Sequence, residues 1–393
     1  MSHGKIAIIG VGEVQTKTAP ERTQWDIIYD TCMEAVRDSG LSKDDIEGVI
    51  STAPQAQERL SAELSFGKLP EELGFVNCKD TVVCNAGGAG TSNCIRMAEH
   101  WIENGLAKAV IVNHVTVQSD IPLPALIGFF GKAGIDLQWE YPFGVTYNLI
   151  MAMMGKIGMV KYGWTEREMA SVTSALRSWA EKDPNSIFYG KKAPTVDQVL
   201  SSDMLATPMH KRESNVLGDG GAALVIVSAE TAKKMGKPAA YKLGESVRYF
   251  SGSVVMRDFE KVEEGLAVTA REAMARAGVT TKDISLWSIY QAYSICHPIM
   301  AASVGICKPE EAGKLFLDGR MSYGGDIPWS TIGDAVGRGH TGSGVSAATY
   351  AETARQLMGK AGERQVKDCK YVFQNTAGGS GFNNIATVWG RDI

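Results

Sequence analysis

The chain of 393 residues is 44% hydrophobic and 21% charged, and its formal net charge at pH 7 is −4. These values are those of a globular protein long enough to bury more than one core, and they give no electrostatic reason to expect nucleic acid or an anionic membrane as a partner. No apolar run approaches the roughly 20 residues of a membrane span, and seven cysteines without a Cys-x-x-Cys pair favour reduced thiols in the cytoplasm and no metal site.

The first predicted elements are a strand and an amphipathic helix. Residues 5–10 form an apolar strand, since the run is too short for a signal peptide and no cleavage site follows it. The helix after it ends at Gly40, a residue type common at helix C-termini, and residues 48–50 form the next strand. The same order returns later, where a helix ends at Gly278 and residues 286–290 form a strand. The sequence therefore contains an internal repeat.

Glycine-rich turns stand at equivalent points of the two repeats. Gly87-Gly88-Ala89-Gly90 precedes a helix in the first, and the segment from Gly337 to Gly344 precedes a helix in the second. Each of these helices is followed by an apolar strand, at residues 108–112 and 370–373, and each repeat closes with another glycine-rich turn and strand. Alternating strands and helices of this kind predict an α/β fold built from two βαβαβ halves.

The two halves differ in length. We predict an N-terminal half at residues 1–235 and a C-terminal half at residues 236–393, with a long insertion in the first half at about 116–203. The insertion is rich in methionine and aromatic residues. Methionines such as Met151 and Met154 either line a substrate surface or pack between halves or subunits.

His340 is the leading candidate for catalysis. It stands among glycines, which let a backbone approach a ligand closely, and the chain has only six histidines. Histidine is the side chain best suited to move a proton near neutral pH. The alternative is a histidine that caps a tight loop.

Three motifs together resemble those of the thiolase superfamily. They are Gly218-Asp219-Gly220-Gly221-Ala222, Gly324-Gly325-Asp326-Ile327-Pro328 and Gly339-His340, and the resemblance covers essentially the whole chain. It is closest to the branch that contains sterol-carrier-protein-x and archaeal members. The resemblance implies a five-layer αβαβα sandwich, in which the two halves enclose a central layer of helices.

The chain departs from this family at the nucleophile. Thiolases carry a reactive cysteine at the start of the first-half helix, and that position falls on Gly88 here. Backbone N–H groups at a helix start still favour an anion. Cys84, in Val82-Val83-Cys84-Asn85, is the alternative source of a sulfur nucleophile, although an apolar run of this kind is equally typical of a buried strand thiol.

Tyr290 points to a different reaction. It occupies the place where cysteine-bearing relatives have a His-Asp or Asn-Glu pair, as in aldolase-like members of the branch that cleave a β-hydroxyacyl-CoA without a cysteine. His340, in contrast, matches the thiolases. Three functions therefore stay open: a thiolase-type acyltransferase that splits a 3-oxoacyl-CoA into two acyl-CoAs, a retro-aldolase, and a non-catalytic scaffold subunit.

Further site residues follow from the resemblance. Gly88 and Gly379 would offer backbone donors to a thioester oxygen, although the turn Gln374–Gly379 lacks the second cysteine of classical thiolases. Tyr147 falls where relatives place a pocket residue, and core packing is the alternative for it.

The resemblance also implies ligands and partners. Coenzyme A would be a substrate or product, with no cofactor bound permanently, and Gly10-Val11-Gly12 lacks the third glycine of a dinucleotide site. The expected partners are acyl-CoA, a second copy of the chain in a homodimer, and a small subunit with a zinc ribbon and an OB-fold. No nucleic acid or membrane is expected.

Overall fold

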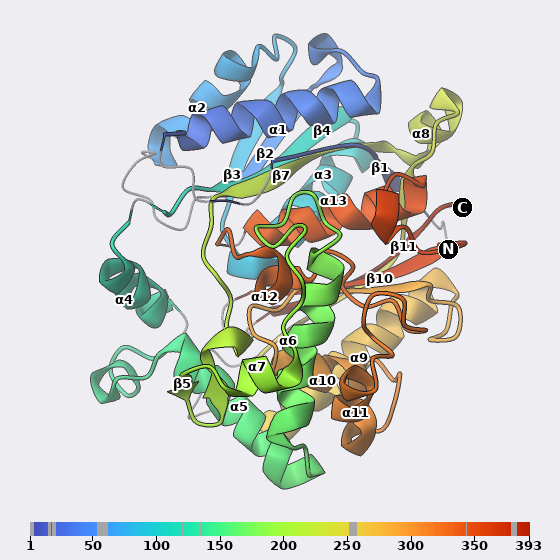
Figure 1. Cartoon of the computed structure of the whole chain (residues 1–393). Helices are drawn as coiled ribbons and strands as arrows, with labels where there is room; N and C mark the ends of the chain where they lie inside the picture. Colours follow the sequence, from blue (N-terminus) through green and yellow to red (C-terminus); the bar gives the residue numbers. More distant parts are fainter. Residues whose placement is uncertain are drawn as a thin grey trace.

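Strands and helices alternate along the chain in the computed structural model (Figure 1), which describes residues 4–14, 17, 21–52, 62–119, 121–133, 135–250, 258–342, 344–378 and 383–393. The predicted donor Gly379 lies outside the described residues. None of the helices in the described part of the chain is long and apolar enough to cross a membrane.

Nine of the described strands form one sheet in the order β3-β2-β4-β7-β1-β8-β11-β10-β9. They are β1 (Ile6–Glu13), β2 (Gly48–Thr52), β3 (Asp80–Cys84), β4 (Ala109–Thr116), β7 (Gly220–Ser228), β8 (Ala240–Tyr249), β9 (Leu286–Ile289), β10 (Tyr371–Gly378) and β11 (Asn383–Gly390). A small second sheet pairs β5 (Met204–Ala206) with β6 (Met209–His210). The described helices are α1 (Gln24–Ser39), α2 (Ala62–Leu73), α3 (Gly90–Glu103), α4 (Leu123–Ala133), α5 (Tyr147–Tyr162), α6 (Glu166–Ala180), α7 (Val196–Leu200), α8 (Ala229–Met235), α9 (Phe259–Ala277), α10 (Cys296–Ser303), α11 (Ala312–Leu317), α12 (Asp334–Arg338) and α13 (Gly344–Met358).

The sheet repeats one pairing pattern. β2 is parallel to β4, and β7 lies antiparallel between β4 and β1. In the same way β9 is parallel to β10, and β11 lies antiparallel between β10 and β8. A short β1–β8 ladder, with Ala7 opposite Tyr241 and Ile8 opposite Ala240, joins the two sets of strands. The boundary predicted at residues 235–236 coincides with the end of α8, and the division into two halves stays a prediction.

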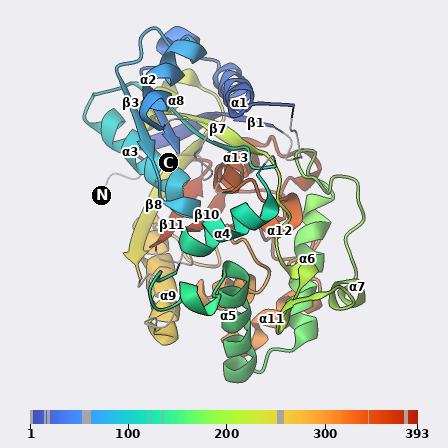
Figure 2. The ribbon, with the colours of Figure 1, turned by 90° about the vertical axis from the view of Figure 1, so that its left-hand side faces the viewer.

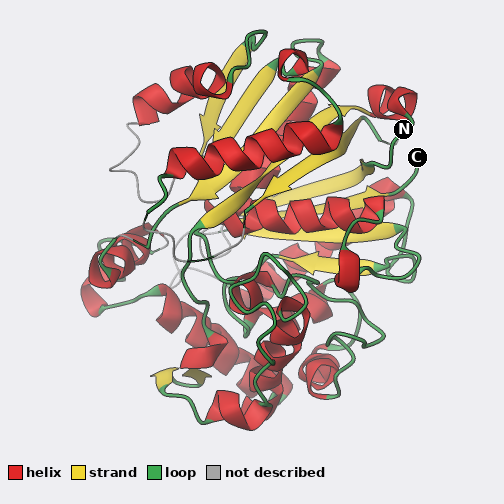
Figure 3. Ribbon diagram, turned by 45° about the horizontal axis from the view of Figure 1, so that its top comes forward, coloured by secondary structure: helices red, strands yellow, loops and turns green. Residues whose placement is uncertain are grey.

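Alternating side chains on the strands build the five layers. On β1, Ile6 and Ile8 pack into the cluster that contains α3 and α13, whereas Ala7 and Ile9 pack against α1 on the other face. The strands of the second set alternate in the same way. On β11, Trp389 packs toward α13 and Val388 packs toward α9. Figure 1 shows α3 and α13 between the two sets of strands, and in Figure 3 the strands lie between layers of helices. The predicted α/β fold, a thiolase-like five-layer sandwich, is confirmed.

The helix ends match the predicted repeat. α1 ends at Gly40 with φ 76° and α9 ends at Gly278 with φ 69°, so that both glycines adopt the left-handed conformation that terminates a helix. Each helix also has a polar N-cap side chain, Thr23 for α1 and Asp258 for α9. The local signals for the two outer helices are thus alike.

The insertion lies far from the strands that it interrupts. Helices α4 to α7 come between β4 and β5 in sequence, yet α6 packs against α11 and α12 of the second half. α5, α6 and α11 gather at the end of the molecule remote from α1 (Figures 1 and 2). The insertion therefore covers α11 and α12 and closes one side of a large cavity.

Candidate active site

One cavity brings the predicted site residues together. Its volume is about 1180 Å³, and its lining includes Cys84, Gly88, Tyr147, Tyr290 and His340. These residues come from β3, the start of α3, the start of α5, the end of β9 and the segment between α12 and α13. Gly378, the last residue of β10, also lines the cavity.

The backbone of His340 is held by the first half of the chain. Its N–H donates to the carbonyl of Val216 at 2.6 Å, and its own carbonyl accepts from the N–H of Gly218 at 3.0 Å and from Nε2 of Gln118 at 2.7 Å. Gly339, which precedes it, has φ 110°, a conformation that favours glycine. The glycine setting read from the sequence therefore lets the loop present His340 to the cavity.

Tyr290 and His340 face each other. The phenol oxygen of Tyr290 lies 3.5 Å from Nε2 of His340, with both side chains buried. Burial lowers the pKa of His340 to about 4, so the imidazole is neutral at pH 7. Burial, followed by the negative charge of Asp334, raises the pKa of Tyr290 above its ordinary value. The pair thus consists of a neutral base and a protonated phenol.

Tyr290 fills the space next to Gly88. A Cβ atom added at Gly88 would lie less than 3.0 Å from Cε1 of Tyr290 and from the carbonyl oxygen of Ala377. No side chain can begin there without displacing a buried ring and a strand backbone. The ring of Tyr290 therefore occupies the space that a side chain at Gly88 would need.

Cys84 lies at the end of β3 and is half-buried at the cavity wall. A hydrogen bond with the thiol of Cys94 lowers the pKa of Cys84 to about 7, against the opposing effect of burial. Cys94 itself is fully buried on α3 and its pKa is raised well above the ordinary value. Cys84 is consequently more acidic than an ordinary thiol, and Cys94 packs in the core.

Both interpretations of Tyr147 agree with its position. It is the first residue of α5, lines the cavity, and packs against the cluster around Met151 and Tyr293. Met154 also lines the cavity, whereas Met153 is exposed. The insertion therefore supplies an apolar wall to the site.

Two groups near the site were missed by the sequence reasoning. Asp334 is fully buried and its carboxylate accepts a hydrogen bond from the N–H of Gln291, the residue after Tyr290. Lys211 is the one lysine or arginine among the described lining residues. An aspartate or a lysine outside a recognisable motif carries no sequence signal that separates it from a surface residue.

Comparison with known proteins identifies relatives along the whole chain. Residues 248–391 match the family described as "Thiolase C-terminal domain-like". The chain is 27% identical to an acetyl-CoA acetyltransferase of Methanothermobacter thermautotrophicus, over 98% of this chain and 99% of the relative. It is 24% identical to the 17-hydroxy-3-oxo-4-pregnene-20-carboxyl-CoA lyase of Mycobacterium tuberculosis, over 91% and 93%, and 23% identical to the benzoylsuccinyl-CoA thiolase subunit BbsB of Thauera aromatica, over 96% and 95%.

A solved structure extends the likeness to three dimensions. The Ltp2-ChsH2(DUF35) aldolase superposes with a TM-score of 0.83 at 22% identity and covers 100% of this chain and 99% of that chain. The fold and the relatives together define a thiolase-like enzyme. The chain belongs to the thiolase superfamily, in the branch that includes sterol carrier protein 2 and the archaeal acetyltransferases, and its chemistry is that of thiolase-fold enzymes acting on acyl-CoA.

Proposed function

We propose that this chain cleaves a carbon–carbon bond of a β-hydroxyacyl-CoA by a retro-aldol reaction, with Tyr290 and His340 as its proton-transfer pair. The observation that carries the proposal is the contact between Tyr290 and Gly88, since the ring excludes any nucleophile from the family's position. A retro-aldol reaction forms no acyl-enzyme and needs only a base, an acid and stabilisation of an enolate.

The proton balance fits the pair. The neutral imidazole of His340 accepts the proton of the β-hydroxyl group while the bond between the α and β carbons breaks. The bond electrons move to the α carbon and the thioester oxygen, and the β carbon leaves as a ketone or aldehyde. Tyr290 then gives its proton to the α carbon and regains one from His340 across their 3.5 Å contact. The product acyl-CoA thus carries the proton that began on Tyr290, the hydroxyl proton of the substrate ends on Tyr290, and both side chains return to their starting protonation states.

Backbone groups would stabilise the enolate. Gly88 lies at the entry to α3, where the helix dipole favours negative charge, and it lines the cavity. We assign Gly88 and Gly379 to the thioester oxygen, as the family resemblance implies. Such a donor is worth about 3–4 kcal/mol in other enzymes.

The lining favours a bulky apolar acyl group. The cavity lining includes aromatic, aliphatic and sulfur-containing side chains such as Met151, Met154, Tyr293 and Met300. A cavity of about 1180 Å³ is larger than an acetyl group requires. We therefore expect the chain to prefer long or cyclic acyl-CoA substrates to acetoacetyl-CoA.

Thiolysis through Cys84 is the second candidate. It is favoured by one observation, the position of a thiol with a pKa of about 7 on the wall of the cavity. In that reaction the Cys84 thiolate attacks the keto carbon of a 3-oxoacyl-CoA, acyl-enzyme forms, and a second coenzyme A releases it.

One experiment separates the two reactions. The purified chain is incubated with a β-hydroxyacyl-CoA of bulky apolar acyl group, and separately with the matching 3-oxoacyl-CoA plus coenzyme A. The aldolase proposal expects ketone or aldehyde release without added coenzyme A. Strict dependence on coenzyme A, together with an acyl adduct on Cys84 by mass spectrometry, would overturn it in favour of thiolysis.

We further propose that the chain acts in a homodimer and with a small partner subunit. Two relatives support this, since one is named as a subunit and the other as a two-protein aldolase. The terminal strand of the sheet, β3, offers an edge for a second copy. Trp139 and Phe143 of the insertion are 66% and 79% exposed, which suits a protein partner. Light scattering of the chain, alone and with a co-expressed zinc-ribbon subunit, tests both assemblies.

A further inference from the structure

We propose that Asp334 is a positioning residue for Tyr290, and that the loop from Ser330 to Asp334 sets the orientation of its phenol toward His340. This inference rests on the proposed role of Tyr290. The loop holds the residues on both sides of Tyr290, and the helix that follows it leads directly to His340.

Hydrogen bonds fix the backbone around Tyr290 from two sides. Oγ of Ser330 accepts from the N–H of Ile289 at 3.2 Å and donates to the carbonyl of the same residue at 3.0 Å. Oδ2 of Asp334 accepts from the N–H of Gln291 at 2.5 Å. On the other side, the N–H of Tyr290 donates to the carbonyl of Asn375 at 2.9 Å. Both peptide neighbours of Tyr290 are therefore bonded to side chains of one loop.

The loop adopts an unfavourable backbone to make these bonds. Ser330 has φ 44° and Asp334 has φ 51°, and both are buried. Among the described residues other than glycine, Asp368 is the one further case of positive φ. L-amino acids with side chains rarely adopt this conformation, and it persists where the surroundings enforce it. Two of the three cases thus coincide with the two residues that hold the neighbours of Tyr290.

The carboxylate of Asp334 is itself oriented. Nε1 of Trp329 donates to Nδ1 of His297 at 2.9 Å, which leaves the proton of the neutral imidazole on Nε2. That nitrogen lies 3.2 Å from Oδ2 of Asp334, and both side chains are fully buried. The indole therefore selects the imidazole tautomer whose Nε2 proton lies beside the carboxylate.

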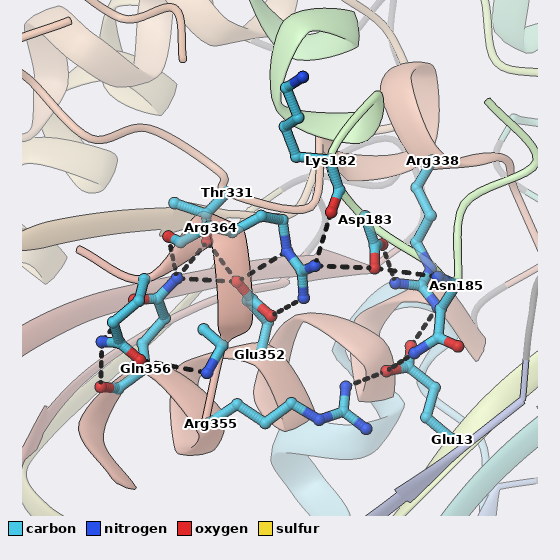
Figure 4. A network of polar contacts seen from close by, with 12 residues as sticks. Glu13, Lys182, Asp183, Asn185, Thr331, Arg338, Glu352, Arg355, Gln356 and Arg364 are labelled. Atoms are coloured by element: carbon cyan, nitrogen blue, oxygen red, sulfur yellow. Dashed lines mark hydrogen bonds and ion pairs between the residues drawn. The ribbon is translucent and has the colours of Figure 1, made fainter. Parts of the chain in front are cut away.

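The far end of α12 is held by a buried cluster of charges (Figure 4). Arg338, the last residue of α12, pairs with Glu13 and, at 2.6 Å, with Asp183. Arg364 bonds to Glu352 at 2.8 Å in the same network. Helix α12 thus begins at Asp334, which bonds to the residue after Tyr290, and ends two residues before His340, so that it acts as a fixed spacer between the two proton-transfer groups.

Substitutions at Asp334 test this directly. In Asp334→Ala the acceptor for Gln291 is lost, and we expect kcat to fall about 100-fold with KM within about threefold, since a misplaced catalytic group costs this much. Asp334→Asn keeps an acceptor oxygen and should recover most of that loss. Ser330→Gly removes the hydroxyl while accepting positive φ, and should lower kcat without loss of folding.

The pH profile provides a readout that a purely structural role would not move. The titratable groups around Tyr290 are His340, Tyr147, Tyr293 and Asp334. Burial, followed by the charge of the Asp334 carboxylate, raises the pKa of Tyr290, while burial raises the pKa of Asp334 itself and its contacts with His297 and the N–H of Gln291 oppose that rise. Removal of this carboxylate in Asp334→Asn should shift the alkaline limb of the kcat profile to lower pH, because the phenol then ionises more easily.

Matched variants keep the outcomes distinct. Glu168→Gln removes another buried carboxylate, one that caps α6 through Thr165 outside the cavity lining and outside the charge cluster of α12, and controls for general destabilisation. If Tyr290→Phe abolishes turnover but Asp334→Ala and Ser330→Gly behave like Glu168→Gln at equal melting temperature, the positioning inference is wrong and the proposed function stands. If Tyr290→Phe retains full activity, the proposed function itself fails.

Discussion

The starts of α3 and α13 are equivalent elements with different roles. Both helices begin after glycine-rich turns in the central layer, where Oγ1 of Thr91 lies 2.7 Å from Oγ of Ser346. At α13 the turn presents the imidazole of His340 to the cavity. At α3 the turn has no side chain at Gly88, and the ring of Tyr290 takes the adjoining space.

This difference shows how the repeat has become asymmetric. Both members of the proposed proton-transfer pair, Tyr290 and His340, come from the second half. The first half provides the backbone at Gly88 and the thiol of Cys84 at the cavity wall. If the predicted C-terminal half performs the chemistry, substitutions of its site residues should abolish turnover. Substitutions in the predicted N-terminal half should instead change the packing around the cavity and the stability of the fold.

The largest effect is expected at Tyr290 and His340. Tyr290→Phe keeps the ring beside Gly88 but removes the hydroxyl, and His340→Ala removes the base. We expect either change to lower kcat by about 10²- to 10⁴-fold on a β-hydroxyacyl-CoA, the usual contribution of one acid or base. Steady-state kinetics with circular dichroism as a folding control provide the measurement. Near-native turnover in both variants contradicts the assignment.

The pH dependence of stability tests the burial of His340. The ordinary pKa of 6.5 applies to the unfolded chain, while burial lowers the pKa in the folded protein to about 4. The unfolded state therefore binds the proton first, and stability is lost as the pH falls from about 6.5 toward 4, by about 3 kcal/mol in total. His340→Asn should lose less stability over this range in urea titrations. His114, buried with a pKa lowered to about 3, stays in place and accounts for a residual slope.

A smaller effect is expected from filling the space at Gly88. Gly88→Ala should destabilise the protein by about 1–3 kcal/mol, because its Cβ meets the ring of Tyr290 and the backbone of Ala377. Gly67→Ala is the matched control, since a Cβ there meets nothing within 4 Å. Combining Gly88→Ala with Tyr290→Ala should recover part of the loss, which a double-mutant cycle detects as coupling. If the changes in the free energy of unfolding of the two single variants simply add in the double variant, the two residues do not compete for space.

The sequence predicted the architecture because helix ends and strand faces depend on residues that are close together in the chain. Gly40 and Gly278 end equivalent helices, and alternating apolar residues such as Ile6 and Ile8 assign strand faces. The missing side chain at Gly88 could also be read. The position of the Tyr290 ring beside Gly88 could not be read, since the two residues are 202 positions apart and meet only where the residue after β9 reaches the turn that precedes α3. Asp334 was missed for the same reason, because its role depends on a hydrogen bond to Gln291.

The smallest effect is expected at Cys84, and a substitution there tests most directly whether the reacting groups come from the predicted C-terminal half alone. Its pKa of about 7 makes it partly thiolate at neutral pH, so that iodoacetamide should label it faster than the buried Cys32 or Cys296, whose pKa values burial raises to about 12. Reactivity alone does not make it a nucleophile for the substrate.

If the second half performs the chemistry, Cys84→Ala should leave kcat within about twofold, as expected for a residue outside the reacting groups. Cys94→Ala, a core substitution on α3, should instead lower stability by about 1 kcal/mol. A Cys84→Ala enzyme that folds normally but has lost turnover would place the decisive side chain in the first half and restore thiolysis as the reaction.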